Sequence, residues 1–224
     1  MKWIHQFQLF LFDFDGLLVN TEHLHFQAYV NTMNRLGFHL DWTFAQFCEL
    51  AHLNSTALKE GLYNQFQDLD PNWDAIYSMK KQQYLELIAS GKVELMKGVS
   101  SLLQSLKKAN IQSCVVTNSP KEQTDLIRSF LKPLDLISHW ITREQYEKPK
   151  PHPEGYLKAI QLFMKPNDRI IGFEDSIRGL KALQQTPALP VLICPSHYPL
   201  LEIGIEKTIH FESFDQIPQN LFKF

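Results

Sequence analysis

The first apolar run of the chain ends directly in two carboxylates. Residues 7–12 are mostly Phe and Leu, and Asp13, Asp15 and Gly16 follow at once. Such a short, nearly continuous apolar run predicts a strand buried in a parallel α/β sheet. Acids at the carboxyl end of that strand lie where open α/β sheets bind ligands. Two close carboxylates repel each other unless a cation or a shared proton neutralises them, so the pattern favours a functional site over a charged turn.

Three later segments also combine an apolar or proline-stiffened stretch with polar side chains. They are Thr117-Asn118-Ser119 after the run 112–116, Lys148 within the proline-rich loop 147–153, and Glu174-Asp175 after the run 169–173. The second half of the chain alternates such runs with helical spacing, which predicts βα units and a parallel sheet.

Taken in order, an acid, a hydroxyl, a lysine and an acidic pair resemble the motifs of the haloacid dehalogenase superfamily. The resemblance spans roughly residues 8 to 195. It is closest to the branch with a helical cap that includes β-phosphoglucomutase, phosphoglycolate phosphatase and small sugar-phosphate phosphatases. The resemblance implies a fold of the α/β class, with a Rossmann-like parallel sheet as its core and an inserted all-α cap domain.

Residues 21–94 fit such an insertion, because they show helical spacing and no convincing strand. We therefore predict a catalytic core of residues 1–20 and 95–224 and a helical cap domain of residues 21–94. In the resembled family, the cap closes over the site and selects the substrate.

The resemblance also implies a role for each acid. Asp13 would be the nucleophile, and an aspartyl-phosphate would split one difficult displacement into two. Mg²⁺ would be held by Asp13, by the backbone carbonyl of Asp15 and by the carboxylate of Asp175, with Glu174 joining directly or through water. Asp175 could instead cap a helix predicted at 176–185.

The remaining motif residues would handle protons and phosphoryl charge. Asp15 would act as the general acid and base. Thr117 would offer its hydroxyl to the phosphoryl oxygens, and Asn118 its amide. Lys148 would neutralise the phosphoryl group and bridge to the nucleophile, because prolines fix its loop. We expect Lys150, in the same loop, to be solvated.

Substrate-binding residues are harder to predict from the sequence. His25, in a His-Phe-x-Ala-Tyr pattern that resembles β-phosphoglucomutase, would lie at the boundary of cap and core, or else be an interior helix histidine. His52 lies in the loop 49–56 that recognises substrate in this branch. This loop lacks the arginine that would hold a second phosphate, and we expect Lys80 and Lys81 to face solvent. The missing arginine favours hydrolysis over a mutase reaction.

The predicted function is therefore that of a Mg²⁺-dependent phosphatase for a small phosphorylated metabolite, with sugar phosphates as the favoured class. The alternatives are a β-phosphoglucomutase-like mutase and a non-catalytic binding module. A formal net charge of -2 gives no electrostatic case for a nucleic-acid partner. The short apolar run at the amino terminus excludes a signal peptide or membrane span, and three scattered cysteines fit a reducing compartment. We expect a cytoplasmic monomer or weak homodimer.

Overall fold

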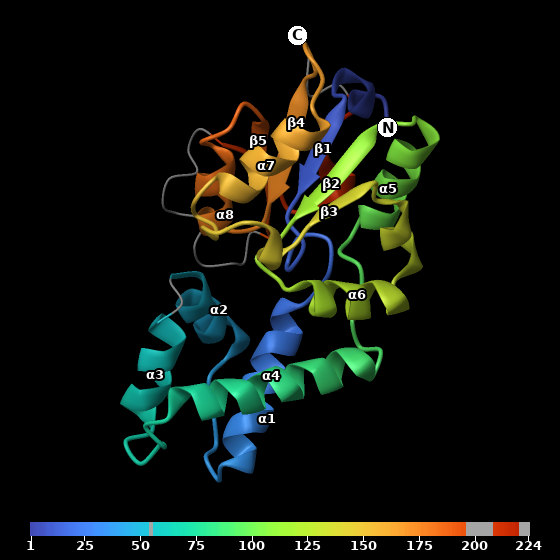
Figure 1. Cartoon of the computed structure of the whole chain (residues 1–224). Helices are drawn as coiled ribbons and strands as arrows, with labels where there is room; N and C mark the ends of the chain where they lie inside the picture. Colours follow the sequence, from blue (N-terminus) through green and yellow to red (C-terminus); the bar gives the residue numbers. More distant parts are fainter. Residues whose placement is uncertain (54–55, 196–207, 220–224) are drawn as a thin grey trace.

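The computed structural model describes residues 1–53, 56–195 and 208–219, without the side chains of residues 52 and 53. Its centre is a six-stranded sheet in which every strand pair is parallel, in the order β3-β2-β1-β4-β5-β6 (Figure 1). The strands are β1 (Leu9–Phe12), β2 (Gln112–Val116), β3 (His139–Ile141), β4 (Ile170–Glu174), β5 (Leu189–Ile193) and β6 (Ile209–Phe211). The predicted α/β class is confirmed.

Strand β1 is completely buried because its side chains enter two different hydrophobic clusters. Phe10 and Phe12 point to one face of the sheet, and Leu9 and Leu11 point to the other. Phe12 also stacks on Phe173 of the neighbouring β4, with ring centroids 5.4 Å apart. Burial on both faces explains why β1 has no polar residue until the strand ends at Asp13.

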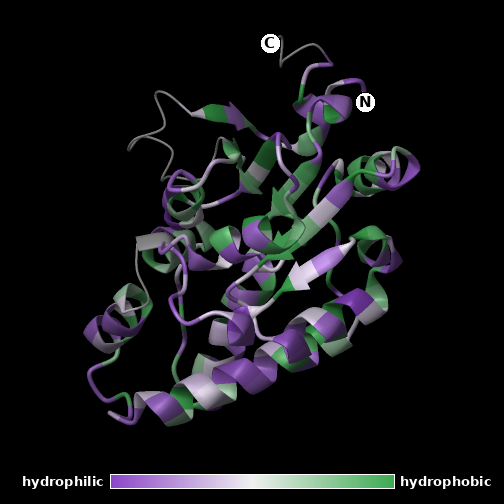
Figure 2. Ribbon diagram, turned by 45° about the horizontal axis from the view of Figure 1, so that its top comes forward, coloured by the Kyte–Doolittle hydropathy of each residue, from purple (hydrophilic) through white to green (hydrophobic). Residues whose placement is uncertain are grey.

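Four helices of the core contribute to the hydrophobic clusters on the two faces of the sheet. Those on one side are α5 (Val99–Lys108) and α6 (Lys121–Phe130), and those on the other are α7 (Glu154–Phe163) and α8 (Ile177–Leu183) (Figure 1). Short 3₁₀ helices occur at η1 (Trp3–Gln6), η2 (Lys132–Leu136), η3 (Arg143–Gln145) and η5 (Phe214–Gln216). Hydrophobic residues concentrate in the central strands, whereas the helices carry both hydrophobic and hydrophilic residues (Figure 2).

The chain between β1 and α5 forms a helical block. Its helices are α1 (Glu22–Arg35), α2 (Phe44–Leu53), α3 (Ala57–Gln65) and α4 (Trp73–Ala89). The block has a hydrophobic cluster of its own, which includes Met33, Phe47 and Leu62. The two connections to the core run side by side, since the Asn20 amide donates to the Glu94 carbonyl at 2.9 Å.

Candidate active site

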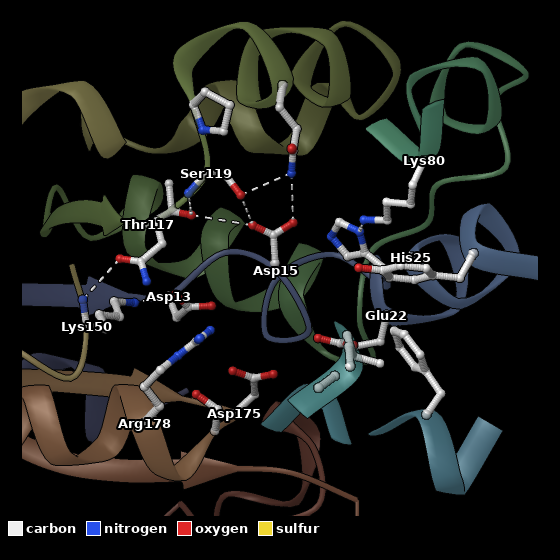
Figure 3. A pocket seen from close by; sticks show the side chains of 18 of the residues that line it. Asp13, Asp15, Glu22, His25, Lys80, Thr117, Ser119, Lys150, Asp175 and Arg178 are labelled. Carbon is white, nitrogen blue, oxygen red and sulfur yellow. Dashed lines mark hydrogen bonds and ion pairs between the residues drawn. The ribbon is translucent and has the colours of Figure 1, made fainter. Parts of the chain in front are cut away.

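A pocket of about 510 Å³ lies between the carboxyl ends of the central strands and the helical block (Figure 3). Both parts of the molecule contribute to its lining. The core supplies Asp13, Asp15, Thr117, Asn118, Ser119, Gln123, Lys150, Asp175 and Arg178, and the helical block supplies Glu22, His25, Tyr29, Trp73, Tyr77 and Lys80, among others. The structure thus brings most of the predicted site residues into one cavity.

Three carboxylates gather on the core side of this pocket. Asp13, Glu174 and Asp175 each offer an oxygen, and these oxygens lie within 4.8 Å of one another. Burial raises the pKa of Glu174 to about 7, against the opposing effect of Lys150. Burial, followed by the charges of Asp13 and Glu174, raises the pKa of Asp175 well above its usual value. The raised pKa values of Glu174 and Asp175 mean that a further cation beside them would favour their charged forms.

The donor set fits Mg²⁺, which prefers hard oxygen ligands. Glu174 is fully buried, and its Oε2 has no hydrogen-bond partner in the described part of the chain. Its Oε1 accepts hydrogen bonds from the Tyr156 hydroxyl at 2.5 Å and from the Lys150 ammonium at 2.7 Å. One oxygen is thus fixed by the protein while the other remains available for a ligand.

The lysine that reaches Asp13 is Lys150, and the expectation that Lys148 bridges to this residue is wrong. Lys150 is only 7% exposed, and its Nζ pairs with Asp13 Oδ1 as well as with Glu174. Burial by itself would lower the pKa of Lys150, but these two carboxylates raise it overall. Lys148 is exposed on the outer side of the loop. The expectation of a solvated Lys150 is therefore also wrong.

Backbone hydrogen bonds explain this choice of lysine. The backbone amides of Glu147 and Lys148 donate to the carboxylate of Glu154 at 2.8 and 2.9 Å, which holds that part of the loop over the start of α7. Two residues later, the Lys150 amide donates to Asn118 Oδ1 at 3.2 Å. Asn118 therefore anchors the lysine loop to the end of β2 through its carbonyl oxygen, a role that the sequence did not predict.

Asp15 turns away from the acidic cluster. Its Oδ2 accepts hydrogen bonds from Ser119 Oγ at 2.5 Å and from Thr117 Oγ1 at 3.4 Å, and its Oδ1 accepts one from Gln123 Nε2 at 3.2 Å. Burial raises the pKa of Asp15 to about 6, although the Ser119 hydrogen bond acts in the opposite direction. A carboxyl group with this pKa can carry or release a proton near neutral pH.

On the side of the helical block, His25 and Lys80 form a buried pair. Lys80 Nζ lies 2.7 Å from His25 Nδ1, and the His25 ring stacks on Tyr84 at 4.0 Å. Burial lowers the pKa of Lys80 to about 8 and holds the pKa of His25 well below its usual value, so the lysine donates to a neutral imidazole. Lys80 is 6% exposed, and the expectation that it faces solvent is wrong. His25 is both an interior helix histidine and a pocket residue.

Several pocket residues were not predicted. Ser119 and Gln123 lie one helical turn apart and together position Asp15. Arg178 projects from α8 toward the space near Asp13 and Asp175 (Figure 3). No sequence motif contains Gln123 or Arg178. Each belongs to the site only because the fold places it beside pocket residues that are distant in the chain. The side chain of His52, which we predicted to bind substrate, lies outside the described residues.

The sequence as a whole matches a known family. The family model described as "haloacid dehalogenase-like hydrolase" matches residues 10–188. The chain belongs to this family. Membership confirms the resemblance and the expectation of an enzyme.

Several known proteins are similar to this chain over most of its length. It is 31% identical to the protein CbbY of Rhodobacter capsulatus over 84% of this chain and 85% of that protein. It is 27% identical to a phosphorylated carbohydrates phosphatase of Thermotoga maritima over 77% of this chain and 78% of that one. The crystal structure of CbbY from Rhodobacter sphaeroides in complex with phosphate superposes with a TM-score of 0.76 at 23% identity, covering 94% and 96% of the two chains.

No helix in the described part of the chain is both long enough and apolar enough to cross a membrane.

Proposed function

We propose that the protein is a Mg²⁺-dependent phosphatase that hydrolyses a small phosphorylated metabolite, with sugar phosphates favoured, through an aspartyl-phosphate on Asp13. This proposal rests on the charged groups that lie beside Asp13. One of its oxygens pairs with the buried ammonium of Lys150, and two further carboxylates lie close by. The name of the Thermotoga maritima relative supports phosphorylated carbohydrates as the substrate class.

In the first half-reaction, a carboxylate oxygen of Asp13 attacks phosphorus while the bond from phosphorus to the leaving oxygen breaks. Asp15 gives its proton to that leaving oxygen, so that an alcohol departs. A raised pKa suits Asp15 to this step, because a useful fraction of the group is protonated near pH 6. Ser119 and Gln123 hold the carboxyl group in position through their hydrogen bonds.

In the second half-reaction, water replaces the alcohol. Asp15, now ionised, takes a proton from the water as its oxygen bonds to phosphorus, and the bond between phosphorus and Asp13 breaks. Inorganic phosphate leaves, and both carboxyl groups return to their starting states. Lys150 and Thr117 would stabilise charge on the phosphoryl oxygens throughout.

Asp13, Glu174 and Asp175 would hold the magnesium ion, with the backbone carbonyl of Asp15 as a further ligand. When bound, Mg²⁺ would offset the negative charge of these acids and of the phosphoryl group. We further propose that residues 21–94 act as a cap that selects the substrate, and that the reaction takes place in the cytoplasm. A mutase would differ by returning the phosphoryl group to a sugar hydroxyl.

The test is release of inorganic phosphate from a panel of phosphorylated metabolites, measured with Mg²⁺ and with EDTA. Asp13→Asn should remove nearly all Mg²⁺-dependent release, since an amide cannot replace the nucleophilic carboxylate. Asp68→Asn is the matched control, because Asp68 is exposed and far from the pocket lining. Activity of more than a few per cent in Asp13→Asn would overturn the assignment. Isomerised product without released phosphate would identify a mutase.

A further inference from the structure

Helix α4 presents a stripe of aromatic residues to the pocket. Trp73, Tyr77 and Lys80 line the cavity, and their spacing of four and three residues places them on one helix face. The rings of Trp73 and Tyr77 are 6.2 Å apart and inclined by 32°. Tyr77 is 49% exposed, so about half of its surface is not covered by protein. A ligand in the cavity can therefore contact this side chain.

Apolar side chains from the other helices of the block extend this surface. Phe47 and Ala51 of α2 and Leu58 of α3 also line the pocket. Together with Trp73 and Tyr77 they form what we call the aromatic wall. The wall comes from the helical block and lines the same cavity as Asp13 of the core, so a substrate with its phosphoryl group at Asp13 can extend toward the wall.

Among the cations of the described pocket lining, Lys80 lies beside this wall, whereas Lys150 and Arg178 belong to the core. Lys150 pairs with Asp13 and Glu174, and Arg178 belongs to α8 on the core side. Lys80 is buried against His25 and lies over the rings of three tyrosines, including Tyr77 at 5.8 Å. Lys59 lies 6.0 Å from the Trp73 ring but is not part of the lining.

The character of the wall limits what can bind there. A second phosphate on the wall would lose water and find in the described lining there only the Lys80 ammonium, which is buried against His25, and such desolvation is costly. The flat face of an uncharged ring would instead exchange water for contact with Tyr77. Both a carbohydrate ring, through its C–H face, and an aromatic ring offer this chemistry.

We propose that the aromatic wall selects phosphate monoesters whose leaving group carries an uncharged ring, and that Tyr77 is the residue on which this ring stacks. The inference rests on the proposed phosphatase function and narrows its substrate class. It predicts that the substrate carries a single phosphate, which binds at Asp13, and an uncharged ring, which binds at Tyr77.

The experiment compares kcat/KM for four esters: glucose 6-phosphate, benzyl phosphate, glycerol 3-phosphate and fructose 1,6-bisphosphate. The first two carry a sugar or an aromatic ring, the third has no ring, and the fourth has a second phosphate. Tyr77→Ala should reduce kcat/KM for at least one of the ring monoesters by roughly tenfold more than for glycerol 3-phosphate. The ring monoester whose kcat/KM falls more in Tyr77→Ala shows whether the wall prefers a sugar ring or an aromatic ring. Tyr77→Phe should keep most of the preference, because it retains the ring.

Phe130→Ala is the matched control, because Phe130 is 44% exposed but lies outside the pocket lining. In this variant the kcat/KM values for the four esters should keep the ratios of the wild type. Equal losses for all four esters in Tyr77→Ala, or a wild-type preference for the bisphosphate, would overturn the inference. If the wild type hydrolyses none of the esters with Mg²⁺, the proposed function fails instead. Calorimetric binding of glucose 6-phosphate and benzyl phosphate to the wild type and Tyr77→Ala then decides the inference alone, and unchanged affinity for both would overturn it.

Discussion

At the scale of single residues, one ammonium group offsets much of the buried negative charge in the site. Lys150 bridges Asp13 and Glu174, and it also lies 4.8 Å from the ring centroid of Tyr156. Without Lys150, these two carboxylates would lose the ammonium that now pairs with both of them. The residue therefore matters both for the ionisation of the site and for any phosphoryl group bound there.

We expect Lys150→Met to reduce kcat by roughly 100-fold or more, because it keeps most of the buried stem and removes the charge. Lys148→Met should change kcat less than twofold, since Lys148 is exposed and contacts Glu154 through its backbone. Steady-state kinetics of the two variants, with melting temperatures to confirm folding, make the comparison. A larger loss in Lys148→Met would restore the original assignment.

The sequence could not distinguish these two lysines for a physical reason. Each is followed by Pro-x-Pro, at 149–151 and again at 151–153, so the same local pattern occurs in two registers two residues apart. The choice depends on Glu154 and Asn118, which hold the two halves of the loop. Asn118 lies 32 residues away in the chain, and no local pattern contains that information.

At the scale of elements, the contact between β4 and α8 determines where the Glu174 carboxylate can lie. Gly179, in the first turn of α8, packs directly against it, and a Cβ at this position would lie 1.9 Å from Glu174 Oε2. Gly172, within β4, packs against Leu183 at the other end of the helix, where a Cβ would lie 2.5 Å from Leu183 Cδ1. The two glycines thus support the same helix but only one of them touches the acidic cluster.

Gly179→Ala should therefore weaken Mg²⁺ binding by roughly 10- to 100-fold, because the carboxylate must move. Gly172→Ala should lower the free energy of unfolding by about 1–3 kcal/mol through overpacking, while Mg²⁺ affinity stays within a factor of about two. Calorimetric Mg²⁺ titration and urea unfolding separate the two effects. Unchanged Mg²⁺ affinity in Gly179→Ala would show that Glu174 has no part in the metal site.

The elements themselves could largely be predicted, because strong periodicity marks them. The apolar runs 7–12, 112–116 and 169–173 overlap β1, β2 and β4, and the helical spacing of residues 21–94 corresponds to the helices of the block. The contacts between elements could not be predicted. Lys80 reaches His25 across 55 residues, and Gln123 reaches Asp15 across 108. Periodicity determines which face of a helix is buried but not which side chain lies opposite.

At the scale of the whole molecule, ionisation of the acidic cluster links metal binding to stability. An acid whose pKa is raised on folding stabilises the folded state below its unfolded pKa and loses that contribution as the pH rises through the folded value. Asp15, with a folded pKa of about 6, and Glu174, with one of about 7, both behave in this way. Metal-free protein therefore loses this contribution between roughly pH 4 and pH 7.

Mg²⁺ should reverse this loss, because it binds the deprotonated carboxylates. We expect a fixed Mg²⁺ concentration to raise the melting temperature by several degrees more at pH 7.5 than at pH 5.5. Thermal unfolding with Mg²⁺ or EDTA at the two pH values provides the measurement, and Asp175→Ala should abolish most of the difference. An equal Mg²⁺ effect at both pH values would contradict a site built from these acids.

The position of β1 at the centre of the sheet also has a consequence during synthesis. Both of its hydrogen-bonded neighbours are made much later, since β2 begins at Gln112 and β4 at Ile170. The helical block, with its own cluster, can fold while β1 still lacks both partners. The emerging chain therefore carries an unpaired, strongly apolar strand until β2 has been made, about halfway through translation. The strand that leads into Asp13 can therefore take its place in the sheet only after residues 112–116 and 170–174 have been made.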